Sequence, residues 1–539
     1  MATPSGLRSI TTEAELLALC IALGAETTGG VISPAEASLI AGGVGTPPIA
    51  SDAVAAARAA VEAGQDPIGD LFSNIRPALE RRDLGAFFTP TPIVTAMINW
   101  ALAKEPARLV DAGCGSGRYA IAARRAGFDG ELIAADLDPF ATIMTRAHFA
   151  AAGYEGAVRN ESFLTLDLAD IDGPTGFIGN PPYVRHHTLP ASVKQWAKTI
   201  AASLGLGISG LAGLHALFFV AVAAHGKIGD FGTFITSSEW MEAKYGQIVR
   251  DLLSGPLGLE RLDMVAPEAD TFDDATTTAV ISSFVLGNTA TASVRVISDP
   301  ASLQALTGGR QVSRARQAAS TRWSDLPHVA RRRPSDHVEL GSLFTVRRGV
   351  ATGANKFFVV TAARAKELGL DGHAVPVTAK AEEVIRAGGD ITAGALTRVL
   401  LDLPSEVSDD DEALAAYLAA GTAAGVHKGY ICSHRTPWWR VGNLSAAPVL
   451  ATYMARQPPT FALNTAKAAN LNSLHGIRAR EGVDIAILPA LVIWLNRNRG
   501  QLVGGRTYQG GLLKVEPKEM EGFLVPTLDH LTELAAASS

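Results

Sequence analysis

The segment Gly176–His187, GFIGNPPYVRHH, places an amide, two prolines and a phenol ring in direct succession. A short apolar run precedes Asn180, so Asn180 to Tyr183 are expected just beyond the end of a strand. An amide oxygen accepts hydrogen bonds, and an aromatic ring offers a face for stacking. A purely structural interpretation is equally compatible with these residues, because prolines end strands and Asn and Tyr are common in the turns that follow.

A second segment, Leu109–Ala123 (LVDAGCGSGRYAIAA), reads as a strand, a glycine-rich turn and a helix. Such a turn brings the backbone close to a ligand and directs helix N–H groups towards it. The glycines are Gly113, Gly115 and Gly117, and Arg118 stands where a dinucleotide fingerprint requires its third glycine. No Gly-Lys-Ser/Thr sequence follows, so neither a dinucleotide site nor a phosphate-cradling loop is indicated.

Asp136, in the segment AADLDP, comes nineteen residues after Gly117 at the end of the next expected strand. A carboxylate there can accept hydrogen bonds from ribose hydroxyls. A ligand with a ribose and no pyrophosphate suggests S-adenosyl-L-methionine, whose cationic groups also suit Asp111. The alternative is a glycine-rich turn that binds no ligand.

The elements that must position these residues follow from the pattern between about 85 and 290, where short apolar runs alternate with helical patterns. This alternation indicates an α/β fold with a mostly parallel, doubly wound sheet. The later strands follow one another closely, which suggests an antiparallel edge. Residues 1 to about 80 are Ala-rich and are expected to form amphipathic helices.

Length and composition indicate a folded protein of two or three domains: 539 residues, 47% hydrophobic and 19% charged. The net charge of −6 argues against a protein that coats nucleic acid generally. Residues 301–350 nevertheless contain nine arginines and three acids, a local balance of +6. The three cysteines are far apart, which argues against a disulfide framework or a cysteine-based zinc site.

No secretory signal is apparent, and a cytoplasmic protein without membrane association is expected. Ala201–His225 is long enough to span a bilayer, but it is glycine-rich and contains His215, so a loop leading into a buried helix is the favoured interpretation. His186 and His187 lack further ligands at metal spacing, so no metal is expected.

Several motifs, in this order, resemble those of the N6-adenine DNA methyltransferases of restriction–modification systems. They are GAFFTPTPIVTAMI, DAGCGSG, AADLDP, NESFL, GNPPY, GTFITSSEWMEAKYGQIVRDLL and DTFDDATTTAVISSFVLG, followed by the C-terminal segments LFTVRRGVATGANKFFVV and RTYQGGLLKVEPKE. The resemblance implies a Rossmann-like, S-adenosylmethionine-dependent methyltransferase fold with a mostly parallel seven-stranded sheet. It also implies four regions: an N-terminal helical region (1–80), the methyltransferase domain (81–290), a basic linker (291–335) and an α+β target-recognition domain (336–539).

The implied activity is methyl transfer from S-adenosyl-L-methionine to N6 of an adenine flipped out of double-stranded DNA. The protein would be the modification half of a restriction–modification system, with any restriction endonuclease for the same site encoded separately. By resemblance, Asn180, Pro181, Pro182 and Tyr183 are catalytic, and Tyr183 and Phe272 stack on the target base. The implied cofactor-binding residues are Thr89, Pro90, Asp111, Gly113, Gly115, Gly117, Asp136, Glu161, Ser162, Phe163 and Asn180.

Two motifs depart from the family pattern. The third motif usually has Asp before Phe, whereas this chain has Glu161-Ser162-Phe163, so either Glu161 or Ser162 is expected to contact the cofactor's adenine. The helix after the Asn-Pro-Pro-Tyr segment often carries Asp-Leu-Tyr, and this chain has Gly213-Leu214-His215.

The resemblance also implies DNA contacts from Arg347, Arg348 and Lys356, which could meet phosphates. For each of them a solvated surface role is an equal alternative. Packing is favoured for Trp438-Trp439-Arg440, and turn formation for Asn470, Asn472 and His475, over contact with DNA.

Three other functions fit parts of the sequence. A protein glutamine N5-methyltransferase also uses Asn-Pro-Pro-Tyr, but such enzymes lack a region like 336–539. A non-catalytic DNA-binding specificity subunit would not need an intact Asn180–Tyr183 segment. A fused restriction–modification enzyme would need a nuclease, and residues 1–80 are short for one and show no convincing cluster of acids and lysine.

Overall fold

A computed structural model describes residues 5–42, 48–76, 89–266, 279–328, 334–408, 410–442, 444–455, 457–501, 506–508 and 512–538. The chain forms two compact units, Met1–Ala330 and Arg331–Ser539.

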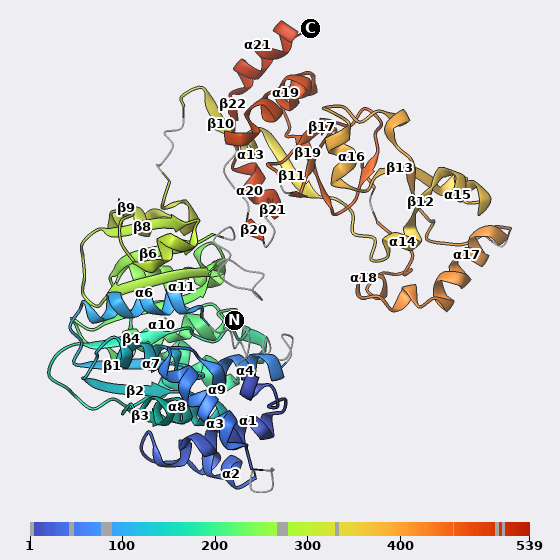
Figure 1. The fold of residues 1–539 in the computed structure, drawn as a ribbon. Coiled ribbons are helices and arrows are strands. Elements are labelled where there is room, and N and C mark those ends of the chain that lie inside the picture. Colours follow the sequence, from blue (N-terminus) through green and yellow to red (C-terminus); the bar gives the residue numbers. More distant parts are fainter. Residues whose placement is uncertain are drawn as a thin grey trace. The chain divides into compact units, whose positions relative to one another are not determined.

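A mixed sheet forms the centre of the first unit (Figure 1). Its described strands are β1 (Arg108–Ala112), β2 (Glu131–Ala135), β3 (Ala157–Arg159), β4 (Thr175–Gly179), β5 (Phe231–Ser237), β6 (Leu259–Val265), β7 (Ala279–Val285), β8 (Ala292–Ile297) and β9 (Arg310–Val312). Their order is β3–β2–β1–β4–β5–β7–β6–β8–β9. β7 and β9 run antiparallel to their neighbours, and the other strands are parallel to one another. The expected mostly parallel α/β sheet is therefore confirmed.

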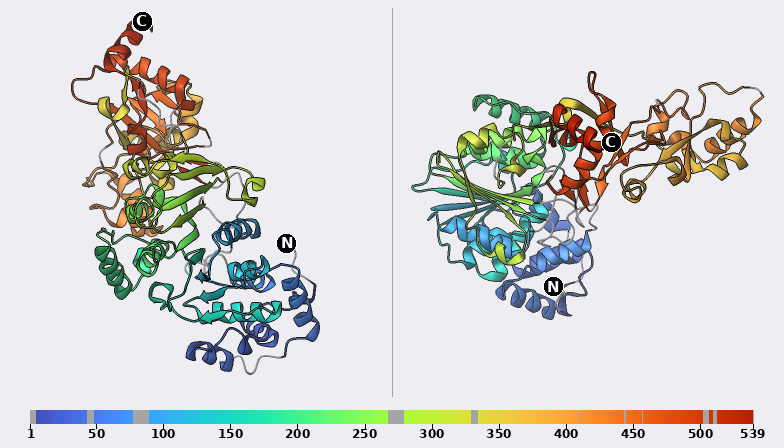
Figure 2. Two further views of the ribbon diagram at one scale, coloured as in Figure 1. Left: turned by 90° about the vertical axis from the view of Figure 1, so that its left-hand side faces the viewer. Right: turned by 90° about the horizontal axis from the view of Figure 1, so that it is seen from above.

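Helices lie on both faces of this sheet (Figure 2). The α-helices described in this unit are α1 (Glu13–Leu23), α2 (Pro34–Gly42), α3 (Ser51–Glu62), α4 (Pro67–Ile75), α6 (Thr91–Leu102), α7 (Arg118–Arg125), α8 (Pro139–Ala152), α9 (Ala191–Ser203), α10 (Leu214–His225), α11 (Gln247–Ser254) and α12 (Arg314–Ala319). Successive side chains of a strand point to opposite faces. Val110 accordingly packs with α10 and α11, and Leu109 packs with α6 and α7.

The sheet has nine described strands rather than the expected seven, because β8 and β9 extend it into the region predicted to be a basic linker. In β8 the buried residues Ala292 and Val294 alternate with the more exposed Ser293 and Arg295, which is a strand pattern that the count of arginines obscured. Several of these arginines bond within the unit: Arg314 donates to the carbonyls of Leu253, Leu259 and Asn288 at 2.8–3.0 Å. The prediction of a linker over 291–335 is therefore wrong for β8, β9 and α12.

The N-terminal helices pack on α8, which lies beside the sheet, and share a hydrophobic core with it. α1 begins with a capping box, in which Thr12 Oγ1 accepts a hydrogen bond from the Glu15 N–H and Glu15 Oε2 accepts one from the Thr12 N–H. Residues 5–42 and 48–76 thus belong to the same compact unit as the sheet.

The predicted buried helix after the glycine-rich loop is α10, whose residues His215 to Val222 are buried. Within the described ranges, no helix is long and apolar enough to cross a membrane.

The second unit is α+β, as expected. Two of its described sheets have four strands each, in the orders β11–β19–β15–β17 and β12–β14–β13–β18. The described strands are β10 (His337–Glu339), β11 (Phe344–Arg348), β12 (Val359–Thr361), β13 (Ala374–Thr378), β14 (Arg398–Leu401), β15 (Val449–Thr452), β16 (Met454–Ala455), β17 (Phe461–Leu463), β18 (Ala469–Asn470), β19 (Leu474–Ala479), β20 (Arg506–Tyr508), β21 (Leu512–Lys514) and β22 (Leu524–Pro526). The described α-helices are α13 (Leu340–Leu343), α14 (Asn355–Phe358), α15 (Ala362–Glu367), α16 (Ala381–Arg386), α17 (Glu412–Ala423), α18 (Tyr430–Ser433), α19 (Leu488–Asn498), α20 (Pro517–Glu521) and α21 (Leu528–Ser538).

Candidate active site

The glycine-rich turn joins β1 to α7 at the carboxyl edge of the sheet. Gly113, Gly115 and Gly117 have φ values of 72°, 56° and 83°, a left-handed conformation that side chains with a Cβ rarely adopt. At Gly117 a Cβ would also lie 3.0 Å from the Thr145 side chain of α8. Glycine is therefore required here both by the backbone conformation and by the close approach of a neighbouring helix.

Asp136 follows β2, next to this turn. Its Oδ2 accepts a hydrogen bond from the Gly115 N–H, and its Oδ1 accepts one from the Asp138 N–H, both at 3.0 Å. Burial raises the pKa of Asp136 to about 6, although these two backbone hydrogen bonds oppose the shift. Asp136 is thus mainly ionised at neutral pH and is held in one orientation.

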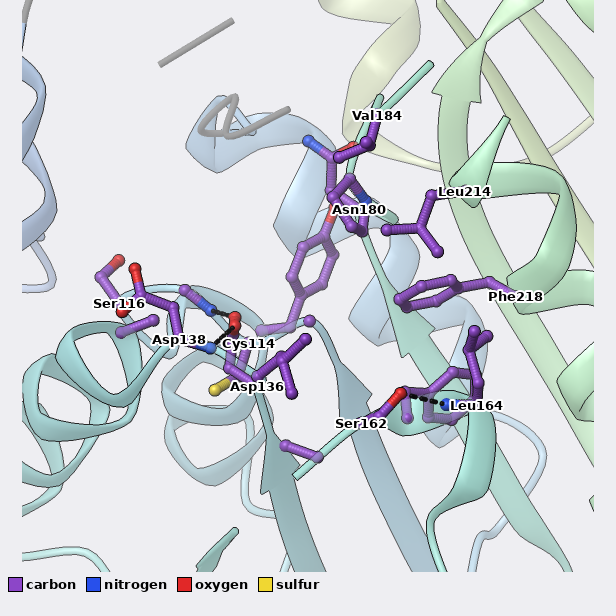
Figure 3. A pocket seen from close by; sticks show the side chains of 18 of the residues that line it. Cys114, Ser116, Asp136, Asp138, Ser162, Leu164, Asn180, Val184, Leu214 and Phe218 are labelled. Carbon is purple, nitrogen blue, oxygen red and sulfur yellow. Dashed lines mark hydrogen bonds between the residues drawn. The ribbon is translucent and has the colours of Figure 1, made fainter. Parts of the chain in front are cut away.

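A cavity of about 450 Å³ lies between the turn, the end of β2 and the segment after β4. This volume is in the range of small-molecule sites. Asp136, Ser162 and Asn180 reach the cavity from different strand ends, and Phe218 of α10 forms part of its wall (Figure 3). The Phe218 and Phe163 ring centroids are 4.9 Å apart, so the wall on this side is aromatic.

Asn180 lies at the end of β4 and lines the same cavity. Its Nδ2 donates to Thr89 Oγ1 at 3.2 Å, and the Tyr119 hydroxyl also donates to Thr89 Oγ1, at 3.0 Å. Because the amide nitrogen of Asn180 makes this contact, the amide oxygen Oδ1 takes no part in it. Pro181 is buried and Pro182 lines the cavity, which restricts the backbone on the C-terminal side of Asn180.

Tyr183 is partly buried beside the cavity rather than in its wall. Its ring meets that of His215 edge-on, with centroids 6.2 Å apart. His215 is 7% exposed, and neither of its ring nitrogens has a hydrogen-bond partner in the part of the chain that the structure describes. Burial lowers the pKa of His215 to about 4, so the imidazole next to Tyr183 is neutral at physiological pH.

The structure brings many of the predicted cofactor-binding residues to one place. Those that line the cavity are Thr89, Gly113, Gly115, Asp136, Ser162, Phe163 and Asn180. Pro90, Asp111, Gly117 and Glu161 do not line it. Phe272, the predicted second stacking residue, lies outside the described residues.

Asp111 and Glu161 fail to reach the cavity for different reasons. Asp111 is fully buried below the turn, where its Oδ2 accepts a hydrogen bond from the Ala120 N–H of α7 at 3.0 Å. Burial raises the pKa of Asp111 well above its usual range. Glu161 is 44% exposed and lies 3.7 Å from the Arg159 guanidinium. In the third motif it is Ser162 that faces the cavity, with its Oγ accepting a hydrogen bond from the Leu164 N–H at 3.3 Å.

Some residues of the cavity wall had no recognisable signal in the sequence. Phe72 of α4 is one, because it lies in an Ala-rich region whose sequence contains no catalytic motif. Others are Val184, Leu189, Pro190 and Val193, which follow the Asn-Pro-Pro-Tyr segment. Only the proximity of Val184 to that segment could have drawn attention to it.

The predicted DNA-contacting residues lie on the surface of the second unit. Arg347 and Arg348 end β11, and Lys356 is in α14; all three are exposed. The Arg348 guanidinium stacks 4.2 Å above the Tyr453 ring.

Trp439, Arg440 and His475 of this unit make contacts within it. Trp439 Nε1 donates to the Pro404 carbonyl at 2.8 Å, and Arg440 lies 3.2 Å from Asp402. His475 is buried and pairs with the Val515 carbonyl at 2.8 Å. Throughout the described ranges, no group of three or more His, Cys, Asp or Glu side chains could hold a metal ion.

The chain is similar in sequence to known methyltransferases. Residues 328–538 match the family of the C-terminal domain of type II methyltransferase M.Eco57I. The chain is 40% identical over 456 residues to type II methyltransferase M.XamI of Xanthomonas campestris pv. amaranthicola, covering 83% of this chain and 86% of that protein. It is 25% identical over 467 residues to type II methyltransferase M.AccI of Acinetobacter calcoaceticus, covering 82% and 85%.

Among solved structures, the fold is similar to that of the type IIL restriction–modification enzyme MmeI in complex with DNA. The TM-score is 0.56 with 14% identity, over 88% of this chain and 73% of MmeI. At this identity the similarity concerns the fold alone.

Proposed function

Because the chain belongs to the type II DNA methyltransferases of restriction–modification systems, we propose that it methylates N6 of an adenine within a specific sequence of double-stranded DNA. The methyl donor in this proposal is S-adenosyl-L-methionine. The observation that carries the proposal is the shared cavity, which is lined both by the turn with Asp136 and by Asn180 and Pro182. The protein would protect DNA against a separately encoded restriction endonuclease of the same specificity.

The described residues fit this cofactor. Asp136 offers a fixed, mainly ionised carboxylate to ribose hydroxyls, and the backbone at Gly113 and Gly115 can approach a ligand closely. Phe163 and Phe218 form an aromatic wall suited to a purine. When bound, the cofactor supplies an electrophilic methyl group.

Asn180 and Pro181 would activate the target. The lone pair of an adenine amino group is delocalised into the ring, so the group is a weak nucleophile. If Asn180 Oδ1 and the Pro181 carbonyl accept its two hydrogens, the lone pair is localised towards the methyl donor. Proline and the hydrogen bond from Asn180 to Thr89 hold these acceptors before the base arrives, which is electrostatic preorganisation.

The base must leave the duplex to reach these groups. Tyr183 would stack on it, a contact worth about 1–3 kcal/mol. The transfer would then be a direct in-line displacement without a covalent enzyme intermediate, in which the N6–methyl bond forms as the sulfur–methyl bond breaks. S-adenosylhomocysteine would leave, and one N6 proton would pass to solvent. Much of the rate would come from proximity and orientation. Exposed Arg347, Arg348 and Lys356 would contact DNA phosphates.

The test is to express the chain in a host that lacks adenine methylation and to sequence the host DNA with a method that detects N6-methyladenine. A single methylated sequence motif is expected, and it should be absent with Asn180→Ala. Methylation of cytosine, or no methylation by folded protein, would contradict the proposal.

A pH dependence of cofactor binding follows from Asp136. Its pKa of about 6 means that the carboxylate becomes protonated as the pH falls through 6 and then loses acceptor capacity. The dissociation constant for S-adenosylhomocysteine should therefore rise as the pH falls from 7.5 to 5. Isothermal titration calorimetry measures this, with Asp136→Asn as the control that should bind weakly and without this pH dependence. An identical pH dependence in Asp136→Asn would assign the effect to another group.

A further inference from the structure

The N-terminal helix α4 contacts the glycine-rich turn directly. The approach is close at Gly69, where a Cβ would lie 2.8 Å from Ser116 Oγ of the turn. Ser116 stands between Gly115 and Gly117 and is 1% exposed. The turn is thus enclosed from the side of α4, and its conformation depends on what that helix presents to it.

Asp66, the N-cap of α4, has a carboxylate with two structural roles. Its Oδ1 accepts a hydrogen bond from the Gly69 N–H at 2.7 Å, which caps the helix. Its Oδ2 accepts from Ser116 Oγ at 2.5 Å and from Arg118 Nε at 2.6 Å. One side chain therefore links the start of α4 both to the turn and to the first residue of α7.

The contacts of Arg118 extend this link towards Asn180. Arg118 Nη2 donates to Asp70 Oδ1 at 2.8 Å, and Nη1 donates to the Thr89 carbonyl at 2.9 Å. Thr89 Oγ1 in turn accepts a hydrogen bond from Asn180 Nδ2. A continuous series of hydrogen bonds and covalent segments therefore runs from α4, past the turn, to the residue proposed to activate the target base.

α4 also contributes to the cavity itself, through Phe72. Its ring is 3% exposed, lines the cavity together with Ala141 and Met144 of α8, and lies 5.8 Å from the Phe140 ring. Asp136, Leu137 and Asp138, at the end of β2, line the same cavity. Phe72 is thus an apolar, aromatic part of a wall that the methyltransferase sheet does not supply.

We propose that the N-terminal helical region is part of the cofactor site: Asp66 is a positioning residue that holds the Gly113–Gly117 turn in its binding conformation, and Phe72 contacts the bound cofactor. This inference rests on the proposed function, because S-adenosyl-L-methionine is the ligand assigned to the cavity. It gives residues 5–42 and 48–76 a role beyond packing on α8.

The charge state of Asp66 agrees with such a role. Burial by itself would raise the pKa of Asp66, but the Arg118 guanidinium, His148 and the Ser116 hydroxyl lower it below its usual value. His148 of α8 lies 3.8 Å from Asp66 Oδ1, and its Nδ1 is 3.0 Å from the Ser116 carbonyl oxygen. The carboxylate therefore stays ionised and can keep accepting from both Ser116 and Arg118.

The test measures binding of S-adenosylhomocysteine to the full chain by isothermal titration calorimetry, together with the ligand-induced rise in melting temperature. Asp66→Asn should raise the dissociation constant about tenfold or more, because hydrogen bonds to a charged group are lost. Phe72→Ala should raise it about tenfold through loss of an aromatic contact. Should Asp66→Asn fail to fold, Ser116→Ala removes the same hydrogen bond from the side of the turn and should weaken binding in the same direction.

Two matched controls separate binding from stability. Leu71→Ala removes a buried neighbour of Phe72 in the same core that does not line the cavity, so it should lower the melting temperature and leave the dissociation constant within about twofold. Asp52→Asn changes an exposed acid in the first turn of α3 and should alter neither the melting temperature nor the dissociation constant.

The outcomes distinguish this inference from the proposed function. Wild-type protein that does not bind S-adenosylhomocysteine would overturn the cofactor assignment, and the inference with it. Wild-type protein that binds, with folded Asp66→Asn and Phe72→Ala binding equally well, would overturn the inference and leave the proposed function intact. A dissociation constant raised as much by Leu71→Ala as by Phe72→Ala would also overturn it, since the effect would then be one of stability.

Discussion

Asn180→Ala should lower the rate of methyl transfer at least about 10³-fold while the protein stays folded, because the preorganised acceptor for the target amino group is removed. The substitution deletes an amide that Thr89 holds in place at the end of β4. The effect should appear in the rate of the chemical step. Single-turnover transfer of a labelled methyl group to DNA carrying the mapped target sequence measures it.

Two further variants sharpen this prediction. Asn180→Asp keeps an oxygen acceptor at the same position and should lose less activity than Asn180→Ala. Asn99→Ala removes an exposed amide of α6 and should transfer methyl groups at the wild-type rate. If Asn180→Ala kept activity within tenfold of the wild type, Asn180 would not be the group that activates the base.

Glu36→Ala should lower the free energy of unfolding of the first unit by about 3–5 kcal/mol, which is the usual cost of leaving one partner of a buried ion pair alone. Glu36 of α2 and Arg146 of α8 are both fully buried, with Oε1 and Nε 2.7 Å apart. Arg146 also donates to the carbonyls of residues 28, 30, 31 and 158 at 2.7–3.0 Å. The guanidinium charge of Arg146 cannot move to solvent unless these hydrogen bonds to the four carbonyls are broken.

Chemical denaturation followed by circular dichroism measures this loss. Glu26→Ala, at an exposed position between α1 and α2, is the matched control and should change the stability by less than about 0.5 kcal/mol. A loss below about 1 kcal/mol for Glu36→Ala would mean that Arg146 finds another partner or water.

The pH dependence of stability should follow the same pair. Burial opposes ionisation of Glu36, but Arg146 and the Ser33 N–H lower its pKa below the usual value. A depressed pKa in the folded state contributes stability above the unfolded pKa, and that stability is lost as the pH falls through the folded pKa. Wild-type protein should therefore lose more stability on acidification than Glu36→Ala does.

Much of the candidate site could be predicted from the sequence because its parts follow parallel strands. The glycine-rich turn follows β1, Asp136 follows β2, and Asn180 follows β4. Since β2, β1 and β4 are adjacent and parallel, their carboxyl ends meet at one edge of the sheet. Local spacing along the chain was therefore enough to predict that these residues lie close to one another.

Which residue of the third motif faces the cavity was not predictable in the same way. In the sequence of the third motif, Glu161 and Ser162 were alternatives. The start of a short helical turn at Phe163 decides between them, because Ser162 is its N-cap and faces the cavity, whereas Glu161 faces solvent near Arg159.

The extent of the sheet and the role of the N-terminal helices were decided only by the tertiary structure. β8 and β9 were hidden by an arginine-rich composition, yet Arg314 hydrogen-bonds to carbonyls inside the unit. Phe72 and Asp66 precede the glycine-rich turn by about forty residues or more, and no periodicity relates them to it. The sequence by itself determined the local motifs and the strands that carry them, because these depend on short-range spacing. Which distant side chains complete the cavity depends on how α4 packs on α8 and the turn, and that packing is a property of the folded chain.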